Sequence, residues 1–311
     1  MKKRKDVRAL VTATLIEQLA AGTKPWSKSW NASGSGLPRR HTGALYHGIN
    51  RLLLMMLGYD NPYFMTFNQA AILSGMTKDK GCNWIRENGK GVRSGEKSPA
   101  HVVYSAQKTV RDYDSDAPDA KKEVYLYCQS AVFNASQIDG LPDRYYPATI
   151  EIDANKTLEH HTAADALVKA MEDEAPIEYQ GDSAFYAPSR DTIRCPVPQA
   201  FESMDAFYAT LLHEGVHRTG HKSRLDRTHD YSEKTGRARE ELVAEIGAAM
   251  LCCAIGLSDK PREDHASYIH SWIQLLENDK NAIFSAAKQA DSAMAYMLDQ
   301  ANQFHGRVIA A

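Results

Sequence analysis

The residues best suited to chemistry lie in the segment LLHEGVHRTGH, where His213, Glu214 and His217 form an HExxH pattern. Residues four positions apart share one face of a helix, so the two imidazoles can hold a single zinc ion. Glu214, beside them, can act as general base for a water whose pKa zinc lowers to about 7. The alternative is a helix with two surface histidines and a solvated glutamate. We interpret the pattern as a zinc-metallopeptidase-type site, which another divalent metal could also occupy.

Such a site needs a third protein ligand, and the sequence offers three candidates. His221 follows Gly220 directly and would have to turn back sharply, so it is disfavoured. In REELVAEIGAAML, the run from Glu241 to Glu245 fits the gluzincin frame of a ligand Glu, two residues, Ala and an acidic residue or Asn. We expect Glu241 to be the ligand and Glu245 to accept the N–H of a zinc-bound histidine. Glu245 as the ligand remains the alternative, and Glu240 is expected on the exposed face of this helix.

Charge is distributed unevenly along the chain. Residues 1–111 hold 18 Lys and Arg against 6 Asp and Glu, a net +12, whereas the remaining residues hold 19 against 33, a net −14. A basic module of this size favours a polyanionic partner such as nucleic acid. The alternative is a basic face that only contacts solvent.

Aromatic residues are interleaved with the basic ones, as in proteins that hold single-stranded DNA by phosphate contacts and base stacking. Core packing is the commoner fate of any one aromatic side chain. No helix-turn-helix or zinc-finger pattern is present, which disfavours a sequence-specific reader of duplex DNA. The expected DNA-contacting residues are Lys24, Trp26, Trp30, Arg39, Arg40, Tyr46, Lys90, Arg93 and Lys97.

The elements that must position these residues fall into two groups. Helical periodicity predicts helices over 203–219 and 236–255, which carry the metal-site residues, and a further helical region over 265–297. The first half is expected to hold a helix over 6–20 and strands over 101–106 and 123–133. The turn-rich segment 140–147 is the best candidate linker. The predicted fold class is α+β with two domains: an N-terminal α+β single-stranded-DNA-binding domain (1–145) and a C-terminal, mostly helical, zincin-like domain of gluzincin type (146–311).

Composition also bears on location. The chain has no apolar run of 18 residues, and Glu17 interrupts the segment after the basic start, so neither a membrane span nor a secretion signal is expected. The five cysteines include no CxxC pair, which is typical of a reducing compartment. We expect a cytoplasmic protein without a membrane partner.

Several longer motifs resemble those of one family, the ArdC plasmid antirestriction proteins. They are TKPWSKSW, RRHTGALYHGIN, PYFMTFNQA, KGVRSGEKSP and VFNASQIDGLP in the first half, and HEGVHRTGHKSRL and REELVAEIGAAML in the second. The first half also resembles the module that precedes the catalytic region of conjugative TraC primases. The resemblance implies a single-stranded-DNA-binding module fused to a zincin-like domain, acting against restriction of incoming plasmid DNA during conjugation. One departure is Arg218, where the family pattern has an aromatic residue.

The sequence is compatible with three functions. The first is an antirestriction protein that binds single-stranded DNA and carries a metallopeptidase, which could act on DNA-bound proteins. The second is a DNA shield whose metal site is only structural. The third is a plain cytosolic metallopeptidase whose basic domain captures acidic substrates. The general base Glu214 favours chemistry, since a structural site has no use for one.

Overall fold

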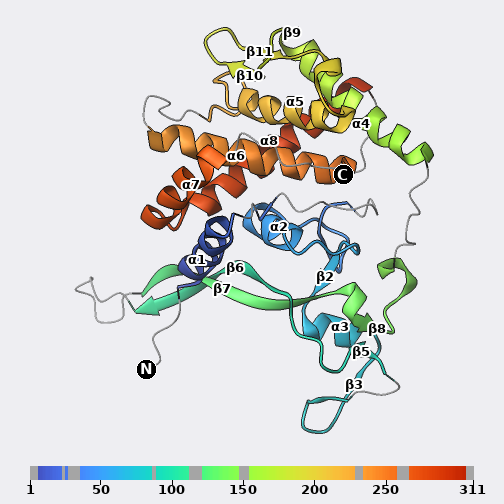
Figure 1. The fold of residues 1–311 in the computed structure, drawn as a ribbon. Helices are drawn as coiled ribbons and strands as arrows, with labels where there is room; N and C mark the ends of the chain where they lie inside the picture. The colour runs from blue at the N-terminus through green and yellow to red at the C-terminus, as the bar shows by residue number, and fades with distance from the viewer. Residues whose placement is uncertain are drawn as a thin grey trace.

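The computed structural model describes residues 6–22, 25–26, 36–85, 89–111, 121–146, 154–227, 234–257 and 266–305. Its N-terminal part is built on a sheet and its C-terminal part is mostly helical, as Figure 1 shows. The predicted α+β fold class with two domains is confirmed. None of the described helices combines the length and apolar character that a membrane span requires.

The N-terminal part is organised around a four-stranded sheet in the order β1-β2-β7-β6. Strands β6 and β7 form a long antiparallel hairpin that continues beyond both predicted strands. At the β6 edge of the sheet, Asn50 bonds the backbone N–H and C=O of Val103 at 2.6 and 2.7 Å, which attaches a helix to that edge. The elements are α1 Val7–Ala20, β1 Arg39–Arg40, α2 Gly48–Met55, β2 Tyr63–Met65, α3 Phe67–Leu73, β3 Thr77–Lys78, β4 Trp84–Ile85, β5 Gly91–Val92, β6 Ala100–Arg111, β7 Lys121–Asn134 and β8 Ile138–Asp139.

The C-terminal part combines a small three-stranded sheet, in the order β10-β11-β9, with five helices in the described residues. The helical region predicted over 265–297 consists of two helices, α7 and α8. Asp279 ends the first of them and its carboxylate accepts the N–H of Asn281 at 2.9 Å. The elements are α4 Ala154–Glu174, β9 Ile177–Tyr179, β10 Phe185–Ala187, β11 Thr192–Cys195, α5 Met204–Thr219, α6 Lys234–Ile255, α7 Ala266–Asn278 and α8 Ala282–His305.

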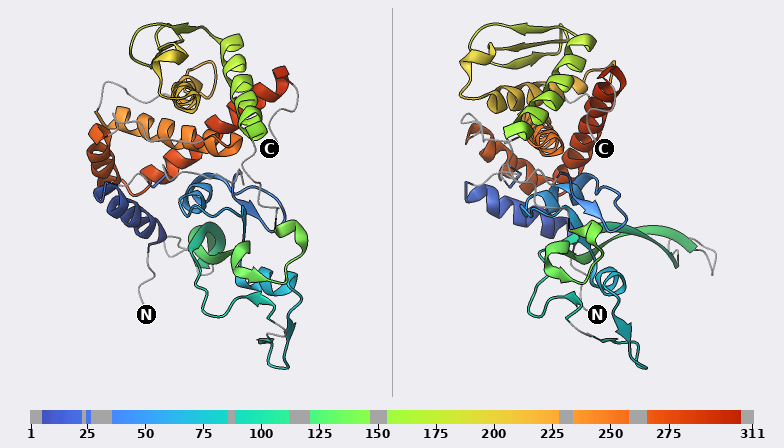
Figure 2. Two further views of the ribbon diagram at one scale, coloured as in Figure 1. Left: turned by 45° about the vertical axis from the view of Figure 1, so that its right-hand side comes forward. Right: turned by 90° about the vertical axis from the view of Figure 1, so that its right-hand side faces the viewer.

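The largest hydrophobic core joins the two parts. Helices α1 and α2 lie between the N-terminal sheet and the C-terminal helices, against α7 and α8 (Figures 1 and 2). Leu15 of α1 and Leu52 of α2 are fully buried in the same cluster as residues of α5, α6 and α8. Buried Arg51 pairs with Asp291 of α8. The N-terminal helices therefore complete the core of the C-terminal part.

Candidate metal centre

Helix α5 presents the two histidines of the HExxH segment. It begins where the Ser203 hydroxyl accepts the N–H of Ala206 at 3.1 Å, and its cap after Thr219 is Gly220, as the sequence predicts. His213 and His217 lie one turn apart, with ring centroids 4.8 Å from each other. The helix thus places two imidazole nitrogens on one face.

Helix α6 brings a carboxylate to this face. The Glu241 oxygens lie 3.6 Å from His213 Nε2 and 3.7 Å from His217 Nε2. One ligand atom from each of the three residues lies within 4.8 Å of the other two. Two imidazole nitrogens and one carboxylate oxygen form a donor set that suits zinc and leaves a fourth position open. This is the set that the sequence predicts.

Two glycines allow the helices to approach this closely. A Cβ at Gly247 of α6 would lie 2.9 Å from both methyl carbons of Val216, which is on α5 between the two histidines. A Cβ at Gly215 would lie 2.7 Å from the methyl carbons of Met171 and Met297. Real Cβ atoms do not approach so closely, so the missing Cβ at Gly247, which faces a stiff branched side chain, permits the short distance between α5 and α6. At Gly215 the neighbouring atoms are the flexible ends of two methionines.

Each histidine has a carboxylate near its other ring nitrogen. A Glu245 oxygen lies 3.6 Å from His213 Nδ1, on the side away from Glu241, where the sequence predicts an orienting group. Glu240 lies 3.3 Å from His217 Nδ1 and has no exposed surface. The prediction that Glu240 lies on an exposed face is therefore wrong.

Arg227 is the reason for the burial of Glu240. Its guanidinium donates to both Glu240 oxygens at 2.7 and 2.9 Å and also to the carbonyl of Val216 and the hydroxyl of Thr219. A buried carboxylate is stable when it is paired in this way. Sequence reasoning missed Arg227, because the loop that follows α5 brings it back to the helix and no local pattern marks that return.

Glu214 is 4% exposed and faces the small sheet. One of its oxygens, Oε2, accepts the backbone N–H of Tyr186 in β10 at 2.9 Å. Strand β10 is held by β11 on its other side, so this contact orients the carboxylate. The hydroxyl of Tyr186 donates to Asp191, which also pairs with Arg224.

The remaining residues of the segment have structural partners. His221 Nδ1 lies 2.8 Å from the Ser223 hydroxyl, and His221 is not part of the metal-ligand group. Arg218, the departure from the family pattern, is 1% exposed and donates to the carbonyls of Met171 and Ala175 at 2.7 and 3.0 Å. It therefore adds a donor to Met171, whose carbonyl also accepts the N–H of Ala175, and supplies one to the carbonyl of Ala175, directly after α4.

The titration of the site reflects its carboxylates. Burial by itself lowers the pKa of His217, but hydrogen bonds to Glu240 and Glu241 and the charge of Glu214 raise the pKa to about 10. Burial raises the pKa of Glu241, whereas its contacts with both histidines outweigh burial and hold that pKa well below its usual range. Without a bound cation, the carboxylates thus favour the protonated, positively charged form of His217.

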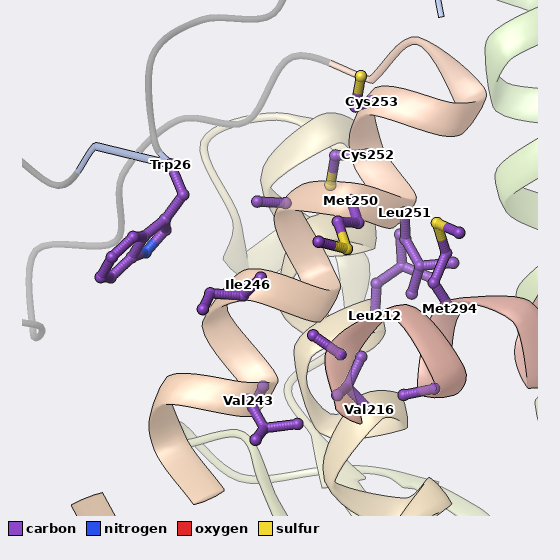
Figure 3. Packing of buried hydrophobic residues seen from close by; sticks show 14 of the residues in the cluster. Trp26, Leu212, Val216, Val243, Ile246, Met250, Leu251, Cys252, Cys253 and Met294 are labelled. Carbon is purple, nitrogen blue, oxygen red and sulfur yellow. The ribbon is translucent and has the colours of Figure 1, made fainter. Parts of the chain in front are cut away.

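Two of the predicted DNA-contacting aromatics are in the core. Trp26 is fully buried with its ring 5.6 Å from that of Trp272, and Figure 3 shows it with other members of the same buried cluster, Ile246 among them. Tyr46 is 6% exposed and donates its hydroxyl to the carbonyl of Phe64. Neither ring is available for stacking on a base. The prediction that Trp26 and Tyr46 contact DNA is therefore wrong, because both rings are packed in the interior.

The predicted basic contacts have different surroundings. Arg39 is partly buried and donates to the carbonyl of Gly43, whereas Arg40 is exposed above the Tyr46 ring. Arg93 is exposed but pairs with Asp139 and Glu96 at 3.2 and 3.1 Å. Lys90 and Lys97 are exposed, and Lys24 and Trp30 lie outside the described residues.

Both halves of the chain match known protein families. Residues 162–289 match the model of a zincin-like metallopeptidase family, and residues 5–133 match that of the N-terminal domain of anti-restriction factor ArdC. Two DNA primases TraC from Escherichia coli are 37% and 36% identical over 95% and 96% of this chain. The chain spans only 27% and 20% of their lengths. The uncharacterized protein y4eC of Sinorhizobium fredii is 31% identical over 94% of this chain and 91% of its own length.

Solved structures show the same relationship over almost the whole chain. The metal-free crystal structure of antirestriction ArdC protein from R388 plasmid has 33% sequence identity and a TM-score of 0.74, covering 97% of this chain and all of that one. The Mn(II)-bound structure of the same protein gives a TM-score of 0.72. With both domain models and a full-length structural relative in agreement, the chain belongs to the ArdC family of antirestriction proteins.

Proposed function

We propose that this chain protects incoming DNA from host restriction during conjugation by binding it as a single strand, and that its C-terminal domain is a metallopeptidase. The observation that carries the peptidase proposal is the assembly of His213, His217 and Glu241 with Glu214 oriented beside them. Restriction acts on DNA in the cytoplasm, where we place the protein.

The proposed ligands are the three residues grouped at the centre. Their two nitrogens and one oxygen favour zinc among the divalent metals, and the Mn(II) in the relative is consistent with a site that accepts a divalent ion. An ion held there would act as a Lewis acid on a peptide carbonyl. Glu245 and Glu240 would hold the two imidazoles in orientation through their Nδ1 atoms.

Glu214 is the proposed general base. Its Oε2 is engaged by the Tyr186 N–H, which keeps the carboxylate in place while it takes a proton from the attacking water and returns it to the leaving amine. Proteins bound to DNA are the proposed substrates, because the DNA-binding half would deliver the peptidase to them. Among the described residues the site has three protein ligands, which would keep a position for reaction and disfavours the DNA shield with a purely structural site.

The test compares Glu214→Gln with His213→Ala in the full-length chain. Glu214→Gln should retain one metal ion per chain and bind single-stranded DNA normally, but lose peptide cleavage, about 10²–10⁴-fold for a general base. His213→Ala should lose the ion. Equal cleavage by the parent and Glu214→Gln would contradict the peptidase proposal. Loss of the antirestriction effect in Glu214→Gln, with DNA binding and metal intact, would show that peptidase chemistry carries protection.

The DNA proposal rests on the basic N-terminal half and its ArdC-type domain. Affinity for single-stranded oligonucleotide should exceed that for duplex and should fall with salt, with a slope of about −0.7 per phosphate neutralised. Filter binding over a salt series measures both. Equal affinity for the two strand states would refute single-strand preference, and a salt-independent affinity would refute the phosphate contacts.

A further inference from the structure

A cavity of about 300 Å³ lies against the N-terminal sheet. Its walls include one face of the β6–β7 hairpin, because Val102 pairs with Ser130 across the hairpin and Tyr104 lies two residues further along the same face. Strand β1 contributes Arg40, and α3 contributes Gln69. Its volume is at the lower end of the range for small-molecule sites, about 300–1,000 Å³, which suits a single nucleotide unit.

The cavity favours an anion. Its lining, within the part of the chain that the structure describes, contains no Asp or Glu. Arg40 is exposed, its guanidinium lies 5.3 Å from the centre of the Tyr46 ring, and it forms no ion pair with any described residue. Burial, together with the positive charges of Arg40 and Arg144, lowers the pKa of His41, another wall residue. An uncompensated guanidinium beside a hollow is suited to a phosphate.

The other walls suit a base and a sugar. Tyr104 is 48% exposed, so its ring offers a stacking surface that buried Trp26 and Tyr46 do not. The Gln69 side-chain oxygen accepts the N–H of Thr66 at 2.8 Å, which leaves its amide NH₂ group as a donor. Cation, aromatic ring and polar donor thus surround one space.

We propose that this cavity holds one nucleotide of the bound single strand, with its phosphate at Arg40 and its base against Tyr104. The inference rests on the proposed binding of single-stranded DNA and specifies where it occurs. It also ranks the basic residues by expected contribution to binding. Arg93 and Arg40 are both exposed, but Arg93 is neutralised by Asp139 and Glu96, so it should contribute less.

The first test is fluorescence anisotropy of the full-length chain with a labelled oligothymidylate. Arg40→Gln and Tyr104→Ala should each weaken binding about tenfold, and Tyr104→Phe should retain affinity because it keeps the ring. Arg93→Gln, which removes the same charge, is the matched control and should remain within about twofold of the parent. Thermal melting of each variant verifies that the fold is intact.

If the parent and all variants bind the oligonucleotide equally, the proposal that the cavity holds a nucleotide is refuted, whereas the proposed binding of single-stranded DNA is not. If Arg40→Gln and Arg93→Gln weaken binding alike, general electrostatics replaces a defined site. If the parent does not bind single-stranded DNA at all, the proposed function itself fails and this inference fails with it.

A second test identifies the contact directly. An oligonucleotide with 5-iododeoxyuridine should cross-link on irradiation to the peptide that contains Tyr104, and Tyr104→Ala should remove that product. Free thymidine monophosphate should compete for the site better than inorganic phosphate, because the base adds contacts. Cross-links confined to other segments, or equal competition by phosphate alone, would overturn the placement of the base.

Discussion

The carboxylate of Glu240 connects the metal centre to a buried arginine. It lies near His217 Nδ1 and accepts two hydrogen bonds from Arg227, which is itself attached to α5 through the Val216 carbonyl. Such outer carboxylates set the orientation and basicity of a ligating imidazole. The residue next to the expected ligand is therefore buried, and we propose that it orients the His217 imidazole.

We expect Glu240→Gln to weaken metal binding by about 10–100-fold, since a neutral amide orients the imidazole less strongly and leaves the Arg227 charge unpaired. Competition with a chromogenic chelator, at a temperature below the unfolding transition of each variant, measures the affinity. Glu277→Gln, on an exposed position of α7, is the control. An unchanged affinity in Glu240→Gln would contradict the orienting role.

The raised pKa of His217 predicts a pH dependence for the metal-free protein. The folded value is about 10, and the value in the unfolded chain is near 6.5. Protonation of His217 therefore stabilises the fold fully below pH 6.5, and this contribution is lost as pH rises through 10. Over the same interval metal binding should become tighter, because the ion competes with the proton.

Melting temperatures of metal-free protein across this interval should fall more steeply for the parent than for His217→Gln, which has no group to titrate there. Comparing the two removes the contribution of lysine and tyrosine titration elsewhere. Parallel curves for parent and variant would show that His217 is not protonated in the metal-free fold.

Helix α6 places Glu241 near the histidines because it packs closely against α5 at one point. Gly247 faces the branched side chain of Val216, and the two methyl carbons there leave no room for a Cβ. The distance between the helices, and with it the 3.6 Å separation of Glu241 from His213, depends on this contact.

Gly247→Ala should consequently lower stability by about 1–3 kcal/mol through overpacking and should also weaken metal binding. The double variant Gly247→Ala with Val216→Ala should recover affinity, because truncating Val216 vacates the space that the new methyl group needs. Chemical denaturation and chelator competition on the same samples measure the two effects. Weakened binding that persists in the double variant would exclude the packing explanation.

At the scale of the whole molecule, the N-terminal helices are part of the core of the C-terminal half. Trp26, Leu15 and Leu52 are all buried against or beside helices of residues 204–305. The isolated segment 1–145 would expose these side chains to water, so DNA binding is best measured on the full chain.

Trp26→Ala should lower the stability of the full chain by about 3–5 kcal/mol, as expected for loss of a buried aromatic side chain. Its affinity for single-stranded DNA, measured below the unfolding transition, should equal that of the parent. Trp84→Ala, where the ring is only partly buried and contacts Lys78, is the matched control and should cost much less. A specific loss of DNA affinity without loss of stability would restore the stacking role to Trp26.

Local patterns were sufficient for much of this protein. Spacing of four residues indicated His213 and His217, because residues four apart share one face of a helix. The frame from Glu241 to Glu245 indicated a second helix that would supply a carboxylate, because it matches the gluzincin pattern. Charge counts along the chain indicated a basic first half without any knowledge of its fold.

Only the tertiary structure decided which residues meet across long stretches of sequence. Glu240 is buried because Arg227 returns to it, and Arg93 is neutralised because Asp139 lies beside it, whereas Arg40 has no described acidic partner. Trp26 is buried because α7 supplies Trp272. An isolated residue type cannot reveal such pairings, since burial and charge compensation are properties of the surroundings that folding creates.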